Sequence, residues 1–416
     1  MKESITIKNF GGLKDVTIPL NSINIFIGKQ ASGKSVTAKL IYFFKKIISN
    51  IMFDVIREKS RVESDGITLE SFKDYFPEET WKDSSFYIKY EFSKEKIVIE
   101  KSKGKELTLK YSPKIQSLFT FAKELESNRK KEEDQTLWRF PSQVTFNNYY
   151  SFVEKELGKN ASNEQRFVPA GRSYFANVKD SIFSILSTNQ TIDPFLIKFG
   201  SDYDFLKRIF RRPNLKFDNR KDRLVSELVD KLIAEILVGK YVEEDNTDYI
   251  IHDDTRKISV SFSSSGQQET LPLLVVLKAL ARIIVYGNGI TTYIEEPEAH
   301  LFPSAQKKIV ELISAIYNNA GIPLQFVITT HSPYILTSFN NLLQAGQLLE
   351  KGVNKKKLFK IVPEFEILKC GELNAYAFAD GGVKSLIDKE TGLISADLLD
   401  QVSEEIAVQF DELLEL

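Results

Sequence analysis

The chain has 416 residues, with 56 basic and 57 acidic side chains and a single cysteine, Cys370. The nearly balanced charge argues against a nucleic-acid coat or a membrane-surface protein, and one cysteine excludes an intrachain disulfide framework. No stretch matches a signal peptide or a membrane span, so we expect a cytoplasmic protein without membrane contact. The length favours one large domain that carries a sizeable insert.

The beginning of the chain contains a phosphate-binding motif. Residues 5–27 read as three short strands, and residues 28–35 read GKQASGKS, which fits the pattern GxxxxGK[ST]. A helix-like run starts at Val36. A strand before and a helix after is the context in which this motif binds a nucleoside triphosphate. The alternative, a glycine-rich turn that binds nothing, needs a chance match of the motif and of both flanking elements.

The residue types in this loop suit phosphate chemistry. Glycines let the backbone wrap a phosphate chain, while N–H groups and the helix N-terminus supply positive dipoles. Lys34 is placed to reach the terminal phosphates, and the Ser35 hydroxyl can ligate Mg²⁺. The predicted nucleotide-binding set is Gly28, Lys29, Gln30, Ala31, Ser32, Gly33, Lys34, Ser35 and Val36.

The central part of the chain changes character twice. Residues 84–111 alternate in three runs that predict an antiparallel β-meander, whereas residues 113–165 and 202–238 read as charged helices. Basic clusters at 129–131 and 207–212 fit either a solvated helix face or contact with DNA phosphates, and the first interpretation is slightly favoured.

Two later apolar runs end in side chains that can take part in catalysis. One run leads into Glu295 and Glu296, followed by Pro297. The first carboxylate at such a strand end can hold Mg²⁺, and the second can orient or deprotonate the attacking water. The other run leads into His331, whose strand we expect beside the carboxylate strand, where the imidazole can contact a γ-phosphate. A solvated acid pair and a structural histidine are the plain alternatives.

Two further segments carry candidate anion-binding groups. Ser264, Ser265, Gly266 and Gln267 precede an apolar helix and form an anion site at its N-terminus, although a plain N-cap explains Ser264 or Ser265 equally well. Arg172 follows a Pro-Ala-Gly turn and is a candidate contact to phosphate or to a dimer partner.

Taken together and in this order, the segments resemble ATPases of the ATP-binding-cassette type. The soluble branch of that group includes SMC, RecF and the OLD-like (overcoming lysogenization defect) nuclease ATPases. The runs IKNFGGL at 7–13 and EEPEAHL at 295–301 look most like the stand-alone OLD-like ATPases of bacteria and archaea. The resemblance implies an α/β fold: a P-loop NTPase of ABC type with a flanking antiparallel β-meander and a helical inserted lobe. It also implies slow hydrolysis of ATP to ADP and phosphate.

The resemblance assigns a role to each motif. It implies that Lys34 binds the β- and γ-phosphates, that Ser35 and Glu295 hold Mg²⁺, that Glu296 is the catalytic base and that His331 is the γ-phosphate switch.

The signature loop, Ser264 to Gln267, then completes the nucleotide site of an opposing subunit, so a homodimer or a higher assembly of dimers is expected. This sequence departs from the family pattern at two positions. Glu295 stands where most of the superfamily has Asp, and Ser265 stands where the LSGGQ signature has Gly. Neither the Q-loop glutamine nor the adenine-stacking aromatic residue can be located from the sequence.

We expect four parts along the chain. Residues 1–112 hold the N-terminal part of the ATPase core with the phosphate loop and meander, and 113–250 form a mainly helical inserted lobe. Residues 251–380 hold the C-terminal part of the core with the signature, Walker B and His switch. Residues 381–416 form an acidic amphipathic tail.

The expected function follows by family analogy. OLD-like nucleases carry a Toprim nuclease domain, for which too few residues follow His331. We therefore expect an ATPase subunit that acts as a sensor or scaffold for a separate effector, a Toprim-like nuclease, as in anti-phage defence of the PARIS type. The alternative is a RecF-like DNA-repair ATPase, so contact with DNA stays open. A transporter ATPase is disfavoured by the opening motif.

Overall fold

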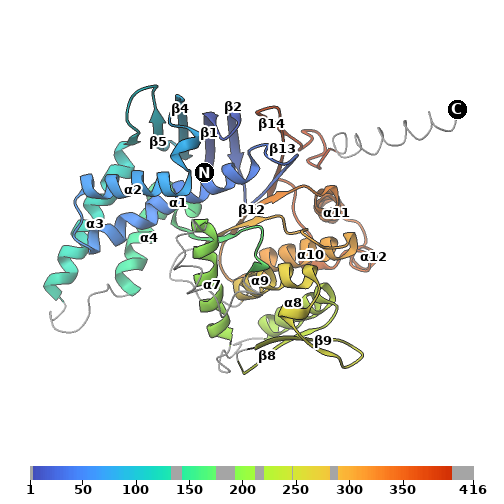
Figure 1. The fold of residues 1–416 in the computed structure, drawn as a ribbon. Coiled ribbons are helices and arrows are strands. Elements are labelled where there is room, and N and C mark those ends of the chain that lie inside the picture. The colour runs from blue at the N-terminus through green and yellow to red at the C-terminus, as the bar shows by residue number, and fades with distance from the viewer. Residues whose placement is uncertain are drawn as a thin grey trace.

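The computed structural model describes residues 3–132, 143–174, 193–210, 220–245, 247–281 and 289–395. These residues form three β-sheets, with helices packed between and around them (Figure 1). None of the described helices is both long and apolar enough to cross a membrane.

The first sheet is antiparallel and includes the expected meander. Its strands are β1 (Glu3–Phe10), β2 (Leu13–Leu20), β4 (Phe86–Phe92), β5 (Glu95–Lys101) and β6 (Thr108–Tyr111). They pair in the order β2-β1-β4-β5-β6. β2 from Val16 to Leu20 and β4 alternate apolar and polar residues, and the apolar ones are buried, which is the pattern of a sheet with one solvated face.

The second sheet positions the phosphate loop. Its strands are β3 (Ile23–Gly28), β7 (Glu164–Val168), β11 (Ile290–Glu295), β12 (Leu324–Thr330), β13 (Leu373–Ala379) and β14 (Gly382–Ser385). The order is β14-β13-β3-β12-β11-β7, and all pairs except β13–β14 are parallel. The expected neighbourhood of β11 and β12 is therefore confirmed. The carboxyl ends of β3, β12 and β11 meet at one edge, where ligands of open α/β sheets bind.

Three strands of this sheet were not predicted. β7 lies within residues 113–250, which were expected to be an inserted lobe, yet it pairs with β11 and so belongs to the core. β13 pairs with β3 on the other side. β14 occupies the beginning of the expected acidic tail, while residues 396–416 lie outside the described part of the chain.

The parallel sheet is buried on both faces. One face packs against helix α1 (Lys34–Ile56), which lies between this sheet and the antiparallel sheet, and Phe26 and Tyr293 belong to that apolar cluster. The other face, with Ile25 and Ile294, packs against further helices. Successive strand residues point to opposite faces, so neighbouring residues serve different cores. The helices that contribute to the second core include α7 (Pro194–Phe210), α8 (Arg220–Leu237), α9 (Ser265–Leu280), α10 (Pro303–Asn319) and α11 (Pro333–Glu350).

The remaining elements pack around the two apolar cores (Figure 1). They are α2 (Arg61–Tyr75), α3 (Pro113–Glu132), α4 (Gln143–Leu157), α12 (Lys355–Leu358) and a small antiparallel sheet of β8 (Lys240–Glu244), β9 (Thr247–Ile251) and β10 (Lys257–Ser259). The α/β fold with a phosphate loop, a flanking antiparallel sheet and many helices matches the expected fold class.

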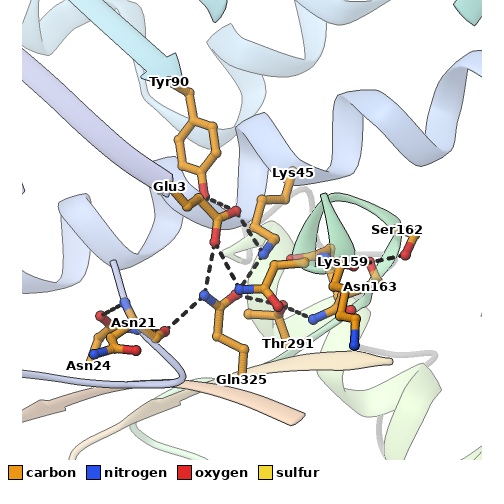
Figure 2. Close-up of polar contacts among 12 residues, drawn as sticks. Glu3, Asn21, Asn24, Lys45, Tyr90, Lys159, Ser162, Asn163, Thr291 and Gln325 are labelled. Atoms are coloured by element: carbon orange, nitrogen blue, oxygen red, sulfur yellow. Dashed lines mark hydrogen bonds and ion pairs between the residues drawn. The ribbon is translucent and has the colours of Figure 1, made fainter. Parts of the chain in front are cut away.

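A buried polar network joins α1 to strands of both large sheets (Figure 2). The Lys45 Nζ atom lies 3.0 Å from Glu3 Oε1 and donates a hydrogen bond to Gln325 Oε1 at 2.6 Å. Tyr90 and Gln325 both donate to the Glu3 carboxylate. Burial acts to raise the pKa of Glu3, but the charge of Lys45 and these hydrogen bonds outweigh it, so the pKa lies below the ordinary value.

Candidate nucleotide-binding site

The phosphate loop connects β3 directly to α1. Gly33 is the residue before the helix, and its φ of 98° lies in the left-handed region. A Cβ atom there would lie 2.9 Å from Leu13 Cγ, so only glycine fits without displacement. The helix therefore begins at Lys34 with its N-terminal N–H groups directed toward the loop, as phosphate binding requires.

Lys34 is buried beneath this loop. Its Nζ atom donates to Gly28 O at 2.7 Å and to Lys29 O at 2.8 Å. Burial lowers the pKa of Lys34, and the negative charges of Glu296 and Glu298 only partly offset this effect. The lysine charge thus lies within electrostatic reach of the carboxylates that follow β11.

The strand ends bring Glu296 and His331 together. The Glu296 N–H donates to Thr329 O at 2.9 Å, and the Glu296 Oε1 atom lies 3.5 Å from His331 Nε2. Both side chains are partly exposed at the carboxyl edge of the sheet. Glu296 has a φ of 44°, an uncommon left-handed value for a residue other than glycine. Its carboxylate is thereby directed out of the line of β11, beside the imidazole.

Glu298 supports this pair in a way that the sequence did not reveal. Its Oε1 atom accepts a hydrogen bond from the His331 backbone N–H at 2.6 Å. From the sequence, Glu298 was only the next candidate for the base after Glu296. Its contact with a residue 33 positions later was not predictable, because it depends on the pairing of β11 with β12.

One cavity of about 770 Å³ joins the phosphate loop to the Glu296–His331 pair. Gln30 through Val36 line it together with both of these side chains. Asn9, Tyr75, Phe76 and Trp81, which come from β1, from the last residue of α2 and from the segment between α2 and β4, also line it. The size is typical of a small-molecule site. Phe76 and Trp81 are buried, so Tyr75 supplies most of the exposed aromatic surface for a planar base. These aromatic residues were missed because nothing in their spacing distinguishes them from core residues.

The residues expected to hold Mg²⁺ fit that ion. Glu295 is buried, and its Oε2 atom accepts a hydrogen bond from Ala170 N at 3.2 Å. No described group donates to its Oε1 atom, which is also buried. Ser35 is exposed and lines the cavity. No group of three or more His, Cys, Asp or Glu with metal-site geometry occurs among the described residues, but Mg²⁺ beside phosphates needs only one or two protein ligands.

The signature segment lies apart from this cavity. Ser264 is the N-cap of α9, and its side chain and that of Gln267 form a reciprocal capping box. Ser265 is exposed, and a Cβ atom on Gly266 would lie 2.7 Å from His300 O. Among the described residues that line the cavity, none belongs to residues 264–267.

Arg172 does not lie where the sequence suggested. Its side chain is completely buried and is absent from the cavity lining. The guanidinium donates to backbone carbonyls of Pro169, Glu269, Glu295 and Glu296. In this arrangement it contacts neither the cavity nor the surface, because a buried cation requires acceptors from the protein itself.

Comparison with known proteins places the chain in a family. A family model described as an AAA ATPase domain matches residues 1–190 and 179–336. The "Retron Vc95 probable ATPase" of Vibrio cholerae serotype O1 biovar El Tor is 26% identical over 126 residues, which cover 29% of this chain and 24% of that relative. The chain thus matches about a quarter of the length of this curated relative.

Solved SMC head domains are also similar. An SMC head bound to the C-winged helix domain of ScpA has a TM-score of 0.43 at 13% identity, over 92% of this chain and 97% of that chain. The SMC head domain from Thermotoga maritima has a TM-score of 0.37 at 11% identity, over the same shares. By the family match, which spans the phosphate loop, the Glu295–Glu296 strand end and His331, the chain belongs to the AAA ATPase domain family.

Proposed function

We propose that this protein binds ATP with Mg²⁺ and hydrolyses ATP slowly. The observation that carries the proposal is the cavity that joins the phosphate loop to Glu296 and His331. The backbone of the loop and Lys34 hold the phosphates, and the part of the cavity lined by Tyr75 accommodates the base. Ser35 and Glu295 would hold Mg²⁺, which would neutralise phosphate charge.

The protein's own groups perform the proton transfer and the positioning. Glu296 accepts the proton of the water that attacks the γ-phosphate, because its carboxylate is partly exposed at the cavity and points away from β11. His331 lies 3.5 Å from that carboxylate and contacts the γ-phosphate. Glu298 fixes the His331 backbone through its 2.6 Å hydrogen bond.

The first test separates binding from hydrolysis. We expect Glu296→Gln to lower kcat by about 10²- to 10⁴-fold while ATP affinity stays unchanged, because the amide fills the same space but accepts no proton. A steady-state assay beside a binding titration measures both quantities. Glu124→Gln, on the exposed face of α3, is the matched control and is expected to behave as wild type. Turnover by Glu296→Gln close to the wild-type rate would assign the base to another group.

The second test concerns binding itself. Lys34→Ala is expected to weaken ATP binding by about 10- to 100-fold, since it removes a charge-assisted hydrogen bond to phosphate. Titration with a fluorescent ATP analogue, with circular dichroism to verify folding, measures the loss. Wild-type affinity in a folded Lys34→Ala protein contradicts the proposed site.

We further propose that two copies of the chain face each other across this edge of the sheet. The signature segment is outside the cavity of its own chain, so it is available to a second copy. Phe262 and Phe302, which are 86% and 77% exposed, and Tyr334 flank the signature, the loop after β11 and His331 respectively. Apolar side chains gathered around polar catalytic groups are typical of an interface that is buried on assembly.

A role in anti-phage defence is the finer part of the proposal. Its support is the partial likeness to the retron ATPase. In this role the chain retains a separate effector, a nuclease, and releases it according to the nucleotide state, which requires different effector affinities in the two states. Co-expression with the protein encoded by the neighbouring gene tests it. Equal release of that protein from wild type and from Glu296→Gln contradicts control by ATP.

DNA binding of the RecF type receives less support. Arg129 pairs with Glu126, where both side chains are largely buried, and Lys130 pairs with exposed Glu58, so both cations already have carboxylate partners. The side chains of Arg208, Arg211 and Arg212 lie outside the described residues. Strong, salt-dependent binding of DNA by the purified chain would restore that alternative.

A further inference from the structure

A buried ion pair links the signature helix to the catalytic strand end. Arg172, in the turn after β7, is 0% exposed, and Glu269, in the second turn of α9, is 2% exposed. The Arg172 Nε atom lies 3.7 Å from Glu269 Oε1 and donates to the Glu269 backbone carbonyl at 2.9 Å. The guanidinium is therefore fixed to both the side chain and the backbone of α9.

The other edge of the same guanidinium is bound to the end of β11. Its Nη1 atom donates to Glu295 O at 2.8 Å, and its Nη2 atom donates to Glu296 O at 3.1 Å. These peptide groups carry the candidate Mg²⁺ ligand and the candidate base. The left-handed backbone of Glu296 is costly and persists only where neighbouring groups stabilise it. Arg172 supplies two of those contacts.

The backbone of the turn that carries Arg172 also donates hydrogen bonds to both α9 and β11. The Glu269 carboxylate accepts hydrogen bonds from the backbone N–H groups of Arg172 and Ser173, at 3.2 and 2.8 Å. On the opposite side, the Ala170 N–H donates to the Glu295 carboxylate. A displacement of α9 thus moves the turn, and the turn moves the Glu295 and Glu296 peptides.

We propose that Arg172 and Glu269 are positioning residues that couple the N-terminal end of α9 to the carboxylate of Glu296 in the same chain. The inference rests on the proposed function, in which Ser264 to Gln267 contact the nucleotide held by a second copy. Because a buried guanidinium cannot leave its carbonyl acceptors without a large free-energy cost, Arg172 follows α9 when that helix shifts. Binding at one nucleotide site then adjusts the catalytic carboxylate of the other site.

The kinetic test uses two substitutions that retain size. Glu269→Gln removes the charge of the pair, and Arg172→Lys keeps a cation but loses the planar fork that reaches two carbonyls. Each is expected to lower kcat by about 10- to 100-fold with KM within about twofold of wild type, as misplacement of a catalytic group does. Glu126→Gln, which breaks a comparably buried pair with Arg129 far from the site in sequence, is the matched control with unchanged kcat.

Amide exchange in mixed dimers tests the coupling directly. One isotope-labelled chain carries Lys34→Ala, which weakens its own ATP binding, and its partner carries Ser265→Asp; ATP is added at a concentration that fills only the partner's phosphate loop. We expect ATP to slow exchange in the labelled chain at 264–270 and also at 294–298. Adding Glu269→Gln to that chain should abolish only the response at 294–298.

The possible outcomes distinguish a failure of the coupling from a failure of the proposed ATPase function. A response at 294–298 that survives Glu269→Gln, or normal kcat in both variants, overturns the coupling and leaves the ATPase proposal intact. If ATP does not slow exchange in the phosphate loop of the wild-type protein, the proposed function fails and the coupling fails with it.

Discussion

At the scale of single residues, the cavity lining combines two kinds of chemistry. The phosphate loop offers backbone N–H groups and the Lys34 charge, whereas Tyr75 adds a partly buried aromatic ring. Trp81 also borders the cavity, but it is only 4% exposed, because its ring packs against Phe72 and Phe86 and its indole N–H is bonded to Phe76 O at 2.8 Å. An aromatic base bound beside Tyr75 would lie near this indole.

This arrangement predicts an intrinsic fluorescence signal. The chain has two tryptophans, Trp81 and Trp138, and Trp138 lies outside the described residues. ATP should quench the emission of wild type and of Trp138→Phe in a saturable titration, because the base stacks near the indole of Trp81. The signal should vanish in Trp81→Phe. Undiminished quenching in Trp81→Phe would place the base elsewhere.

Residues identified from the sequence are those whose partners are close in sequence or whose spacing forms a motif. Lys34, Glu296 and His331 were found in this way, and all three line the cavity. Trp81 could not be found, and Glu298 was only the next candidate for the base, because each acquires its place from a contact with a distant segment. Arg172 was expected to contact phosphate or a dimer partner, but it is buried, and its burial depends on β7 pairing with β11, which its local sequence does not specify.

At the scale of elements, the same distinction applies. Strands that alternate over several residues, such as those of the antiparallel meander, were predictable from their period. β7 has only five residues, three of them polar, and reads as the end of a helical region until β11 is placed beside it. β13 contains small residues that become strand-like only between β3 and β14. Parallel pairing partners are set by tertiary packing, not by local propensity.

The buried pair of Glu3 and Lys45 predicts a pH dependence of stability. The folded pKa of Glu3 is below the ordinary 4.5, so in acid the unfolded chain binds a proton more readily than the folded one. The stabilising contribution is therefore complete above pH 4.5 and disappears as the pH falls through the lower folded pKa. Urea unfolding from pH 7 down to about pH 3.5 measures this loss.

A substitution isolates the contribution of Glu3. Glu3→Gln leaves Lys45 buried without its counterion and is expected to lower the free energy of unfolding at neutral pH by about 3 kcal/mol. It should also flatten the acid limb of the stability profile. Glu124→Gln should leave that limb unchanged, since its side chain is exposed. An acid limb that persists unchanged in Glu3→Gln would assign it to other carboxylates.

At the scale of the whole molecule, the distribution of motifs favours a composite site. The phosphate loop, Glu296 and His331 share one cavity, but the signature end of α9 is separated from it and borders exposed Phe262 and Phe302. In the proposed function, each chain holds a nucleotide in its own phosphate loop and presents its signature segment to the nucleotide of the other copy. Two copies related by a two-fold axis would make both of these contacts.

A mixing experiment tests this assembly, and Ser265 is the better target than Gly266. Any side chain on Gly266 would meet His300 O, whereas Ser265 is exposed at the start of α9. Ser265→Asp suits a helix N-terminus but repels phosphate, so the variant should fold and be inactive alone, as should Lys34→Ala. In a mixed dimer, the intact loop of one chain meets the intact signature of the other. Random mixing should therefore restore about a quarter of the wild-type turnover, because half of the dimers are mixed and each has one complete site.

The matched control replaces the charge and keeps the size. Ser265→Asn should retain turnover alone, since the amide neither repels phosphate nor disturbs the helix end. Analytical ultracentrifugation with ATP establishes that the variants still assemble. If Lys34→Ala and Ser265→Asp form mixed dimers but recover no activity, or if a monomer hydrolyses ATP at the full rate, the signature acts within its own chain. In that case α9 must leave its observed position, where it packs so closely against His300 that a Cβ atom on Gly266 would lie 2.7 Å from the His300 carbonyl oxygen.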